Sequence, residues 1–338
     1  PLLGMLIAGF ALRNIVEASG SKALILDTEW SSALKSIALV VILTRAGLGL
    51  KLDVLKKLSA ALLRLIFIPN LSEAVVDAAL AVAFFDMPWT FALALGFIIS
   101  AVSPAVVVPS LLSLQERRFG TAKGIPTLVL AAASFDDVLS ISGFGICIGL
   151  AFSSSSHGLA FNLARAPLEV IAGVGAGALT GYVTAKLTMF DMPSMEDGDG
   201  NGQDQATKAT RLRVFALLIF GMLAVFGGRR VHFTGAGALC IIIAGIICAR
   251  LWGQAATARV EGVFKEAWIA AAQPLLFVLI GSSVSTTYLD ARFVGKGVAI
   301  LLIGLTVRLL ASILCVWTPQ FTLKERVFIA LAWFPKAT

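Results

Sequence analysis

The stretch "SAVSPAVVVPS", residues 100–110, sets two prolines, Pro104 and Pro109, inside an apolar run. A proline lacks the backbone N–H donor and frees a carbonyl group, which within lipid must find another partner. The last apolar run has a similar interruption, Pro335 in "AWFPKAT" (332–338). We therefore expect two helices that break inside a membrane, at Pro104 and Pro109 and at Pro335, with a simple proline kink as the alternative.

The rest of the chain predicts an all-α polytopic membrane protein. Of its 338 residues, 58% are hydrophobic and 14% are charged, whereas soluble domains are roughly one quarter charged. We expect the chain to be a fragment of a longer one, because its first run starts at Pro1 and its last run stops early at Thr338. The apolar runs, most of them close to the roughly 20 residues of a spanning helix, cover residues 1–17, 31–50, 59–85, 88–114, 122–152, 166–190, 211–229, 232–252, 266–289, 296–318 and 325 onward.

Lysine and arginine residues indicate the orientation of the spans. They gather in the even-numbered connections, as in Lys51, Lys56 and Lys57 after the second run. Short loops rich in these residues stay in the cytoplasm, so we place the even-numbered connections there, although Arg229 and Arg230 disagree. The net charge of +7 is thus a signal of topology, and no nucleic-acid partner is expected.

Five charged residues lie well inside the predicted spans, where an unpartnered charge is costly and points to a functional site. They are Glu73, Asp136, Asp137, Arg308 and Lys336. The two aspartates, in "AAASFDDVLSI" (131–141), have no basic residue within a dozen positions on either side. Three negative and two positive charges leave one net negative charge, which one monovalent cation or one proton neutralises.

The spacing of these features indicates an inverted repeat. The two broken runs, the fourth and the eleventh, are seven elements apart, and so are the third run, with Glu73, and the tenth, with Arg308. Because seven is odd, the members of each pair cross the membrane in opposite directions, as in transporters with inverted-topology repeats. We expect two discontinuous helices that cross near the midplane, where the charged residues gather.

The paired aspartates predict a site for a cation and a proton. Carboxylate, hydroxyl and carbonyl oxygens suit hard cations, so we expect Na⁺ or Li⁺ at Asp136 and Asp137, with Ser103 adding its hydroxyl group. Adjacent residues on a helix point about 100° apart. One aspartate can therefore face the cation path while the other faces a basic residue on a neighbouring helix. Such a site exchanges cations for protons without a cofactor when the protein alternates its access.

The segments "VSPAVVVPS", "SFDDVL", "VRLLAS" and "AWFPKAT" closely resemble the NHA-type sodium/proton antiporters of the cation/proton antiporter superfamily, above all the animal exchangers of solute carrier family 9, subfamily B. The resemblance implies an integral membrane transporter, not an enzyme, that serves pH homeostasis as a homodimer. It also implies a core that moves like an elevator, with Asp137 as the main carrier, Asp136 beside it and Ser103 at the unwound crossover.

The resemblance suggests a division of the chain into four parts. Residues 1–58 would form helices on the dimerisation side, and 59–190 would hold the core helices of the first repeat and a linker helix. Residues 191–210 would form an acidic cytoplasmic loop, and 211–338 would form the second repeat, cut short in its crossover helix.

Arg308 is a departure from many bacterial relatives, which resemble this chain but place a lysine there that pairs with the first aspartate. Arginine keeps its proton at physiological pH, so it cannot release one in a transport cycle. We expect a structural ion pair between Glu73 and Arg308, with Asp136 as the alternative partner, and the stoichiometry of exchange stays open.

Three other functions are compatible with parts of this pattern. A sodium-coupled symporter of an organic anion would share the inverted repeat. An intramembrane aspartyl protease needs two aspartates that share a proton on facing helices, whereas here they are adjacent on one helix. A structural protein would not need buried acids beside helix breaks. His157 and His232 are candidates for pH sensing that we do not favour.

Overall fold

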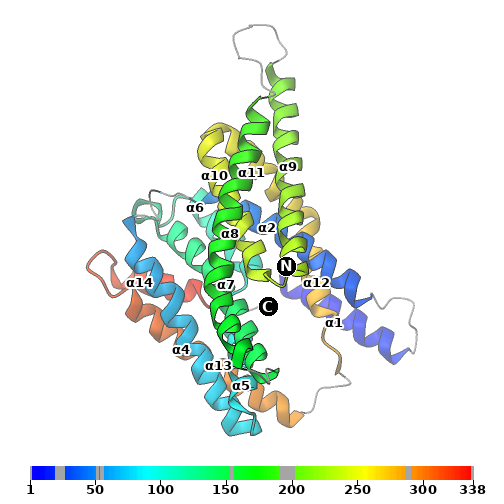
Figure 1. The fold of residues 1–338 in the computed structure, drawn as a ribbon, viewed down its shortest axis with the longest axis vertical. Coiled ribbons are helices and arrows are strands. Elements are labelled where there is room, and N and C mark those ends of the chain that lie inside the picture. Colours follow the sequence, from blue (N-terminus) through cyan, green and yellow to red (C-terminus); the bar gives the residue numbers. More distant parts are fainter. Residues whose placement is uncertain are drawn as a thin grey trace.

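The computed structural model describes residues 2–19, 27–50, 53, 57–152, 156–190, 202–286 and 291–335, which are almost entirely helical and contain no strand (Figure 1). Lys336 and most of the acidic loop lie outside these residues, as does the side chain of His157. The elements are α1 (Leu2–Ala18), α2 (Thr28–Gly49), α4 (Ser59–Phe85), α5 (Trp89–Ser100), α6 (Pro104–Glu116), η1 (Thr121–Lys123), α7 (Ile125–Phe152), α8 (Ser156–Phe190), α9 (Gly202–Arg230), α10 (Thr234–Trp252), α11 (Gln254–Ala267), η2 (Trp268–Ala272), α12 (Gln273–Gly281), α13 (Ala291–Cys315) and α14 (Leu323–Ala332).

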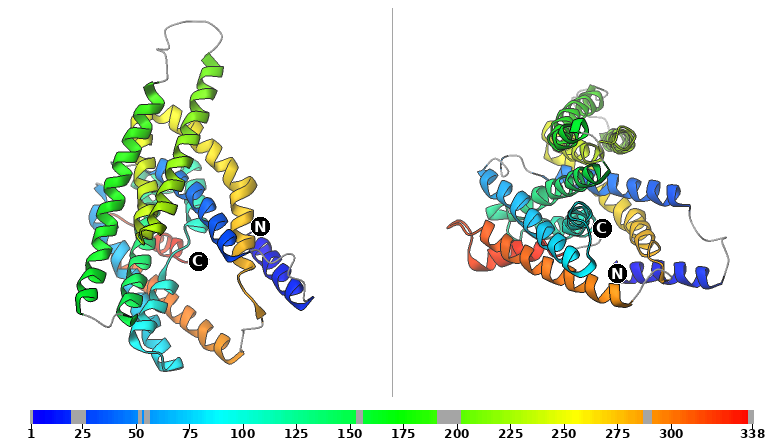
Figure 2. Two further views of the ribbon diagram at one scale, coloured as in Figure 1. Left: turned by 45° about the vertical axis from the view of Figure 1, so that its right-hand side comes forward. Right: turned by 60° about the horizontal axis from the view of Figure 1, so that its bottom comes forward.

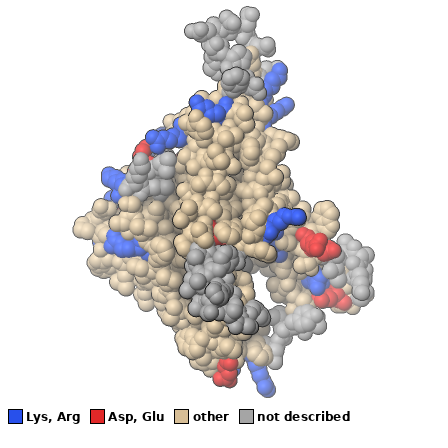
Figure 3. Space-filling view, viewed as in Figure 1, with Lys and Arg blue, Asp and Glu red and all other residues tan. Residues whose placement is uncertain are grey.

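The helices have the length and composition of membrane spans. Nine helical stretches of the described residues are long and apolar enough to cross a bilayer, with α5 and α6 counted as one stretch and α11, η2 and α12 as another. Large apolar side chains such as Leu179 on α8 and Leu223 on α9 remain exposed. On the face seen in Figure 3, charged side chains lie mostly at the periphery and leave a broad uncharged surface. Because lipid, unlike water, solvates such a surface, the chain is an integral multi-pass membrane protein, as predicted.

The first broken helix divides between α5 and α6. The ψ angles of Ala101 and Ser103, 135° and 108°, are extended rather than helical. Helix α6 then begins at Pro104, where a proline costs no hydrogen bond because the first N–H of a helix has no partner within it. The expectation that Pro109 also breaks the chain is wrong, since α6 passes through it. A proline inside a helix removes one hydrogen bond and bends the axis, but the adjoining turns can continue.

The segment after α14 meets the break between α5 and α6. Helix α14 ends at Ala332, before Pro335. The backbone N–H of Ser103 donates to the carbonyl oxygen of Pro335 at 3.3 Å, so the two proline-containing segments, more than 200 positions apart in the chain, are in direct contact. Helix α13 packs against α4, as the expected ion pair between Glu73 and Arg308 requires. The predicted fold class is confirmed.

Helix α7, which carries both aspartates, occupies the centre of the molecule. It packs against α4, α5 and α6 on one side and against α8 and α10 on the other (Figure 2). A close backbone contact holds α4 and α5 together. In α5, Gly96 lies so near to Ala74 of α4 that a Cβ atom at Gly96 would overlap the Ala74 carbonyl oxygen.

Several helix limits differ from the predicted runs. Helix α9 begins at Gly202, nine residues before the predicted start, because its polar first turns extend beyond the apolar part that hydropathy detects. The span predicted at 266–289 instead occupies Gln254–Gly281. Its first part, α11, is strongly amphipathic, and a π-helical segment, η2, joins it to α12.

Candidate functional site

Arg308 of α13 is the centre of a buried polar cluster. Its side chain is 0% exposed. Nη1 donates to Glu73 Oε2 of α4 at 2.7 Å, and Nη2 donates to Asp136 Oδ1 of α7 at 2.9 Å. Nη1 also donates to the carbonyl oxygen of Ser100, the last residue of α5, at 2.5 Å. The guanidinium group lies over the ring of Trp333, 5.1 Å from its centroid.

This arrangement answers the question of which acid Arg308 binds, because the arginine binds both. Its planar guanidinium group presents N–H donors in a fixed fork, which lets one cation hold two carboxylates at once. The Ser100 carbonyl adds the partial negative charge of the α5 C-terminus. Arg308 thus ties together α4, α5, α7 and the end of α14.

Asp136 is fully buried and has hydrogen bonds at both carboxylate oxygens. Oδ1 accepts from Arg308 and, at 3.1 Å, from Asn70 Nδ2. Oδ2 accepts from the backbone N–H of Val102, in the break between α5 and α6, at 3.3 Å. Donors from three separate elements therefore fix this carboxylate in one place.

Asp137, the next residue along α7, is in a different environment. It is half-buried, and within the described part of the chain its carboxylate forms no hydrogen bond or ion pair with another residue. Helical geometry turns it about 100° away from Asp136. The two aspartates thus differ as the sequence suggested, one facing a basic residue on a neighbouring helix and the other directed elsewhere.

Ser103 lies at the break, as predicted, and is buried. Its backbone carbonyl accepts from the N–H groups of Val106 and Val107 in the first turn of α6. No hydrogen bond joins the Ser103 hydroxyl to either aspartate among the described residues. The direct link from the break to the acidic pair is instead the N–H of Val102. Lys336 lies outside the described residues.

Three residues of the cluster were not singled out from the sequence. Asn70 of α4 donates to Asp136 and to Ser140 Oγ of α7, the latter at 2.7 Å, and Trp333 packs against Arg308. All three are uncharged, so a search for charges inside spans passes over them. The spacing of Asn70 and Glu73, three positions apart on one helix face, was the signal that could have indicated Asn70.

Two further buried acids belong to helix contacts around the cluster. The carboxylate of Asp77, fully buried on α4 one turn beyond Glu73, lies against Gly304 of α13, where a Cβ atom would overlap it. Glu169 of α8 accepts from the N–H of Gly235 at 3.0 Å, in the first turn of α10. A carboxylate is favourable at that end of a helix, so Glu169 joins α8 to α10.

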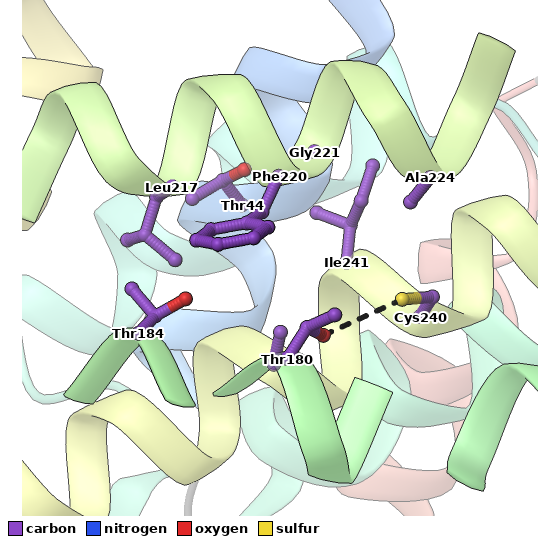
Figure 4. A pocket seen from close by; sticks show the side chains of 10 residues that line it. Thr44, Thr180, Thr184, Leu217, Phe220, Gly221, Ala224, Cys240 and Ile241 are labelled. Atoms are coloured by element: carbon purple, nitrogen blue, oxygen red, sulfur yellow. Dashed lines mark hydrogen bonds between the residues drawn. The ribbon is translucent and has the colours of Figure 1, made fainter. Parts of the chain in front are cut away.

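A small cavity lies apart from the acidic cluster, among α2, α8, α9 and α10 (Figure 4). Thr44, Thr180, Thr184 and Cys240 contribute its polar atoms, and Thr180 Oγ1 lies 3.6 Å from Cys240 Sγ. With a volume of about 10 Å³ it could hold about one water molecule. The buried charged cluster on α4, α7 and α13 is therefore the candidate functional site, because it holds the buried charges Glu73, Asp136 and Arg308.

The fold and the cluster define the class of the protein. A multi-pass helical chain with a broken helix whose break contacts the segment after α14, and with buried acids and an arginine beside it, has features of secondary transporters with inverted repeats. In keeping with this, the structure resembles that of the sodium proton antiporter MjNhaP1 from Methanocaldococcus jannaschii at pH 8, with a TM-score of 0.67 over 98% of this chain and 75% of the other. The sequences are 17% identical, so this likeness concerns the fold.

The sequence comparisons are more specific. The family described as "Sodium/hydrogen exchanger, transmembrane" matches residues 1–338, and this chain belongs to that family. It is 43% identical to "Sodium/hydrogen exchanger 9B2" of Mus musculus and of Homo sapiens, and 40% identical to "Sodium/hydrogen exchanger 9B1" of Homo sapiens. Each match covers 100% of this chain but only 58%, 59% and 62% of the relative, respectively. The chain thus spans about three fifths of their length.

Proposed function

We propose that this chain forms the ion-translocating part of an antiporter that exchanges Na⁺ for H⁺ across a membrane, and that Asp137 binds the two ions in turn. Membership of the sodium/hydrogen exchanger family supports the reaction and the ions. The contrast between the two aspartates supports the role of Asp137. Asp136 is held by three donors, whereas the Asp137 carboxylate has no such partner in the described residues.

A carboxylate without protein donors can take a proton or coordinate a small hard cation through its oxygens. Because the two ions use the same oxygens, binding of one displaces the other. Exchange then requires only that the site open to each side of the membrane in turn. Arg308 keeps its proton throughout, so its duty in this proposal is to hold Asp136 and Glu73 while Asp137 does the exchange.

Three finer features belong to the same proposal. Li⁺ is a second substrate, because the same hard oxygen ligands suit it. The core around α4, α5, α6, α7, α13 and α14 moves as a unit against the rest, in the manner of an elevator. The protein works as a homodimer. A sodium-coupled symporter of an organic anion is not retained, since the relatives named above are all exchangers.

The direct test is ion exchange in liposomes. Wild-type protein is reconstituted with a pH-sensitive dye inside, and Na⁺, Li⁺ or K⁺ is added outside. The proposal expects Na⁺ and Li⁺ to drive proton movement, and expects lower pH to raise the apparent KM for Na⁺ with little change in maximal rate. A pH effect confined to the maximal rate would contradict a shared site.

A further inference from the structure

Asn70 joins α4 to α7 at the level of the acidic pair. Its side chain is fully buried, and its Nδ2 donates to Asp136 Oδ1 at 3.1 Å and to Ser140 Oγ at 2.7 Å. Asp136 and Ser140 are four residues apart and so lie one turn apart on the same face of α7. One amide group therefore holds two successive turns of α7 against α4.

Asn70 also closes a ring of polar contacts. Glu73, on the same face of α4, accepts from Arg308, and the other arm of Arg308 donates to Asp136. Asp136 in turn accepts from Asn70. Helix α4 thus reaches Asp136 by two routes, one through an ion pair and one through a neutral amide.

An asparagine is suited to this position because it donates two N–H groups without adding charge. A lysine would compete with the cation, and an acid would repel Asp136. With an apolar side chain in its place, α7 would be held at this level by Arg308 and the Val102 N–H, and Ser140 would lose its contact with α4. A small rotation of α7 would then displace Asp137, which projects from the next position of the same helix.

We propose that Asn70 is a positioning residue for cation binding, which sets the rotation of α7 against α4 and thereby the place where Asp137 meets the cation. This inference rests on the function proposed above, because it presupposes that Asp137 binds the transported cation. A positioning role differs from a purely structural one in its effect on cation binding. Loosening of this contact should weaken cation binding more than it slows the transport cycle.

The test is the Na⁺ dependence of exchange by the full chain in liposomes, at one pH, for wild type and for Asn70→Leu, which is similar in size but has no donor. A hydrogen bond to a charged group is worth about tenfold or more in an equilibrium constant. We expect the KM for Na⁺ to rise on the order of tenfold, with the maximal rate per folded protein changed less than about twofold. The KM of Asn70→Gln, which keeps both N–H donors, should lie between the KM of wild type and that of Asn70→Leu.

Two further variants share the same assay. Ser140→Ala removes one of the two contacts and should raise the KM about two- to threefold, and adding it to Asn70→Leu should raise the KM no further. Ser134→Ala is the matched control, because Ser134 is also buried on α7 but its hydroxyl donates to the Leu130 carbonyl of its own helix. Its KM should equal that of wild type.

A second measurement, without transport, separates this inference from the proposed function. Because a ligand stabilises the state that binds it, Na⁺ should raise the melting temperature of wild-type protein, and Asn70→Leu should need about ten times more Na⁺ for the same rise. No Na⁺ effect on wild type in either assay would count against the proposed function itself. If wild type responds to Na⁺ and Asn70→Leu needs no more Na⁺ than wild type, the role of Asn70 is overturned. If Asn70→Leu does not fold, an unchanged Na⁺ requirement in Ser140→Ala would overturn it in the same way.

Discussion

At the scale of single residues, Arg308 shows how a charge is maintained in the interior of a membrane protein. Its guanidinium group has two carboxylate partners, a helix-end carbonyl and an aromatic ring. Removing charged groups from water is costly, and only good geometry with further hydrogen bonds offsets that cost. The cluster meets this condition for Arg308, Glu73 and Asp136, which are each at most 1% exposed.

Removal of either partner of the buried pair should destabilise the protein, and removal of the arginine should cost more. Breaking a buried ion pair typically costs about 3–5 kcal/mol, because it leaves the other charge unpaired. Arg308→Ala strands two carboxylates, whereas Glu73→Ala leaves Arg308 bound to Asp136. Thermal unfolding should therefore give the larger loss for Arg308→Ala. The double variant should cost clearly less than the sum of the single ones. Simple addition of the two losses would mean that the pair does not act as a unit.

At the scale of helices, close backbone packing helps to place the break between α5 and α6 beside the charged cluster. Helices α4 and α5 approach each other at Gly96, opposite Ala74, the neighbour of Glu73. The C-terminal residue of α5, Ser100, lies about one turn beyond Gly96 and carries the carbonyl that Arg308 binds. The contact at Gly96 therefore helps to bring the break between α5 and α6 next to the arginine.

Gly96→Ala should separate α4 from α5 and lower stability. Its new methyl group would overlap a backbone carbonyl, which cannot move as a flexible side chain can, and overpacking costs about 1–3 kcal/mol. Gly175→Ala on α8 is the matched control, since no atom lies within 4 Å of its added Cβ position. It should be neutral or slightly stabilising, because alanine favours a helix over glycine. Equal melting temperatures for the two variants would contradict the packing argument.

The features that could be predicted from the sequence are those with an energetic cost in lipid. Prolines and charges within apolar runs are rare enough to locate the first break, α4, α7 and α13, and the count of runs indicated which helices pair. Pro109 was misjudged because a kinked helix and a broken one have the same sequence signal. Asn70 and Trp333 were missed because uncharged side chains in a span carry little cost. Their importance follows from the tertiary contacts alone.

At the scale of the whole molecule, an ion-pair cluster joins α6, a helix of the proposed moving core, to α2 and α11, which lie outside that core. Glu116, at the end of α6, lies 2.8 Å from Lys265 of α11 and 3.7 Å from Arg45 of α2. Arg45 is 3% exposed and also lies 3.9 Å from Glu261. If α6 moves relative to α2 and α11 during exchange, as proposed, these contacts must open in each cycle.

Linking α6 to α11 should therefore stop exchange. The chain's four cysteines are all buried, so Glu116→Cys with Lys265→Cys can be joined selectively by a short bismaleimide. The linked protein should lose most of its Na⁺-driven proton movement in liposomes, while each single cysteine variant treated in the same way keeps it. Full activity of the linked protein would show that these two helices do not need to separate.

The central claim is that Na⁺ and a proton occupy Asp137 in turn, and proton release on cation binding tests it most directly. Purified wild-type protein in weakly buffered detergent solution, near neutral pH, should acidify the solution when Na⁺ is added, because the cation displaces the proton. Asp137→Asn keeps the shape of the side chain but cannot take up or release a proton. A well-folded Asp137→Asn protein should therefore give no acidification. Proton release by this variant equal to that of wild type, or none from wild type at any pH at which Na⁺ binds, would contradict the account.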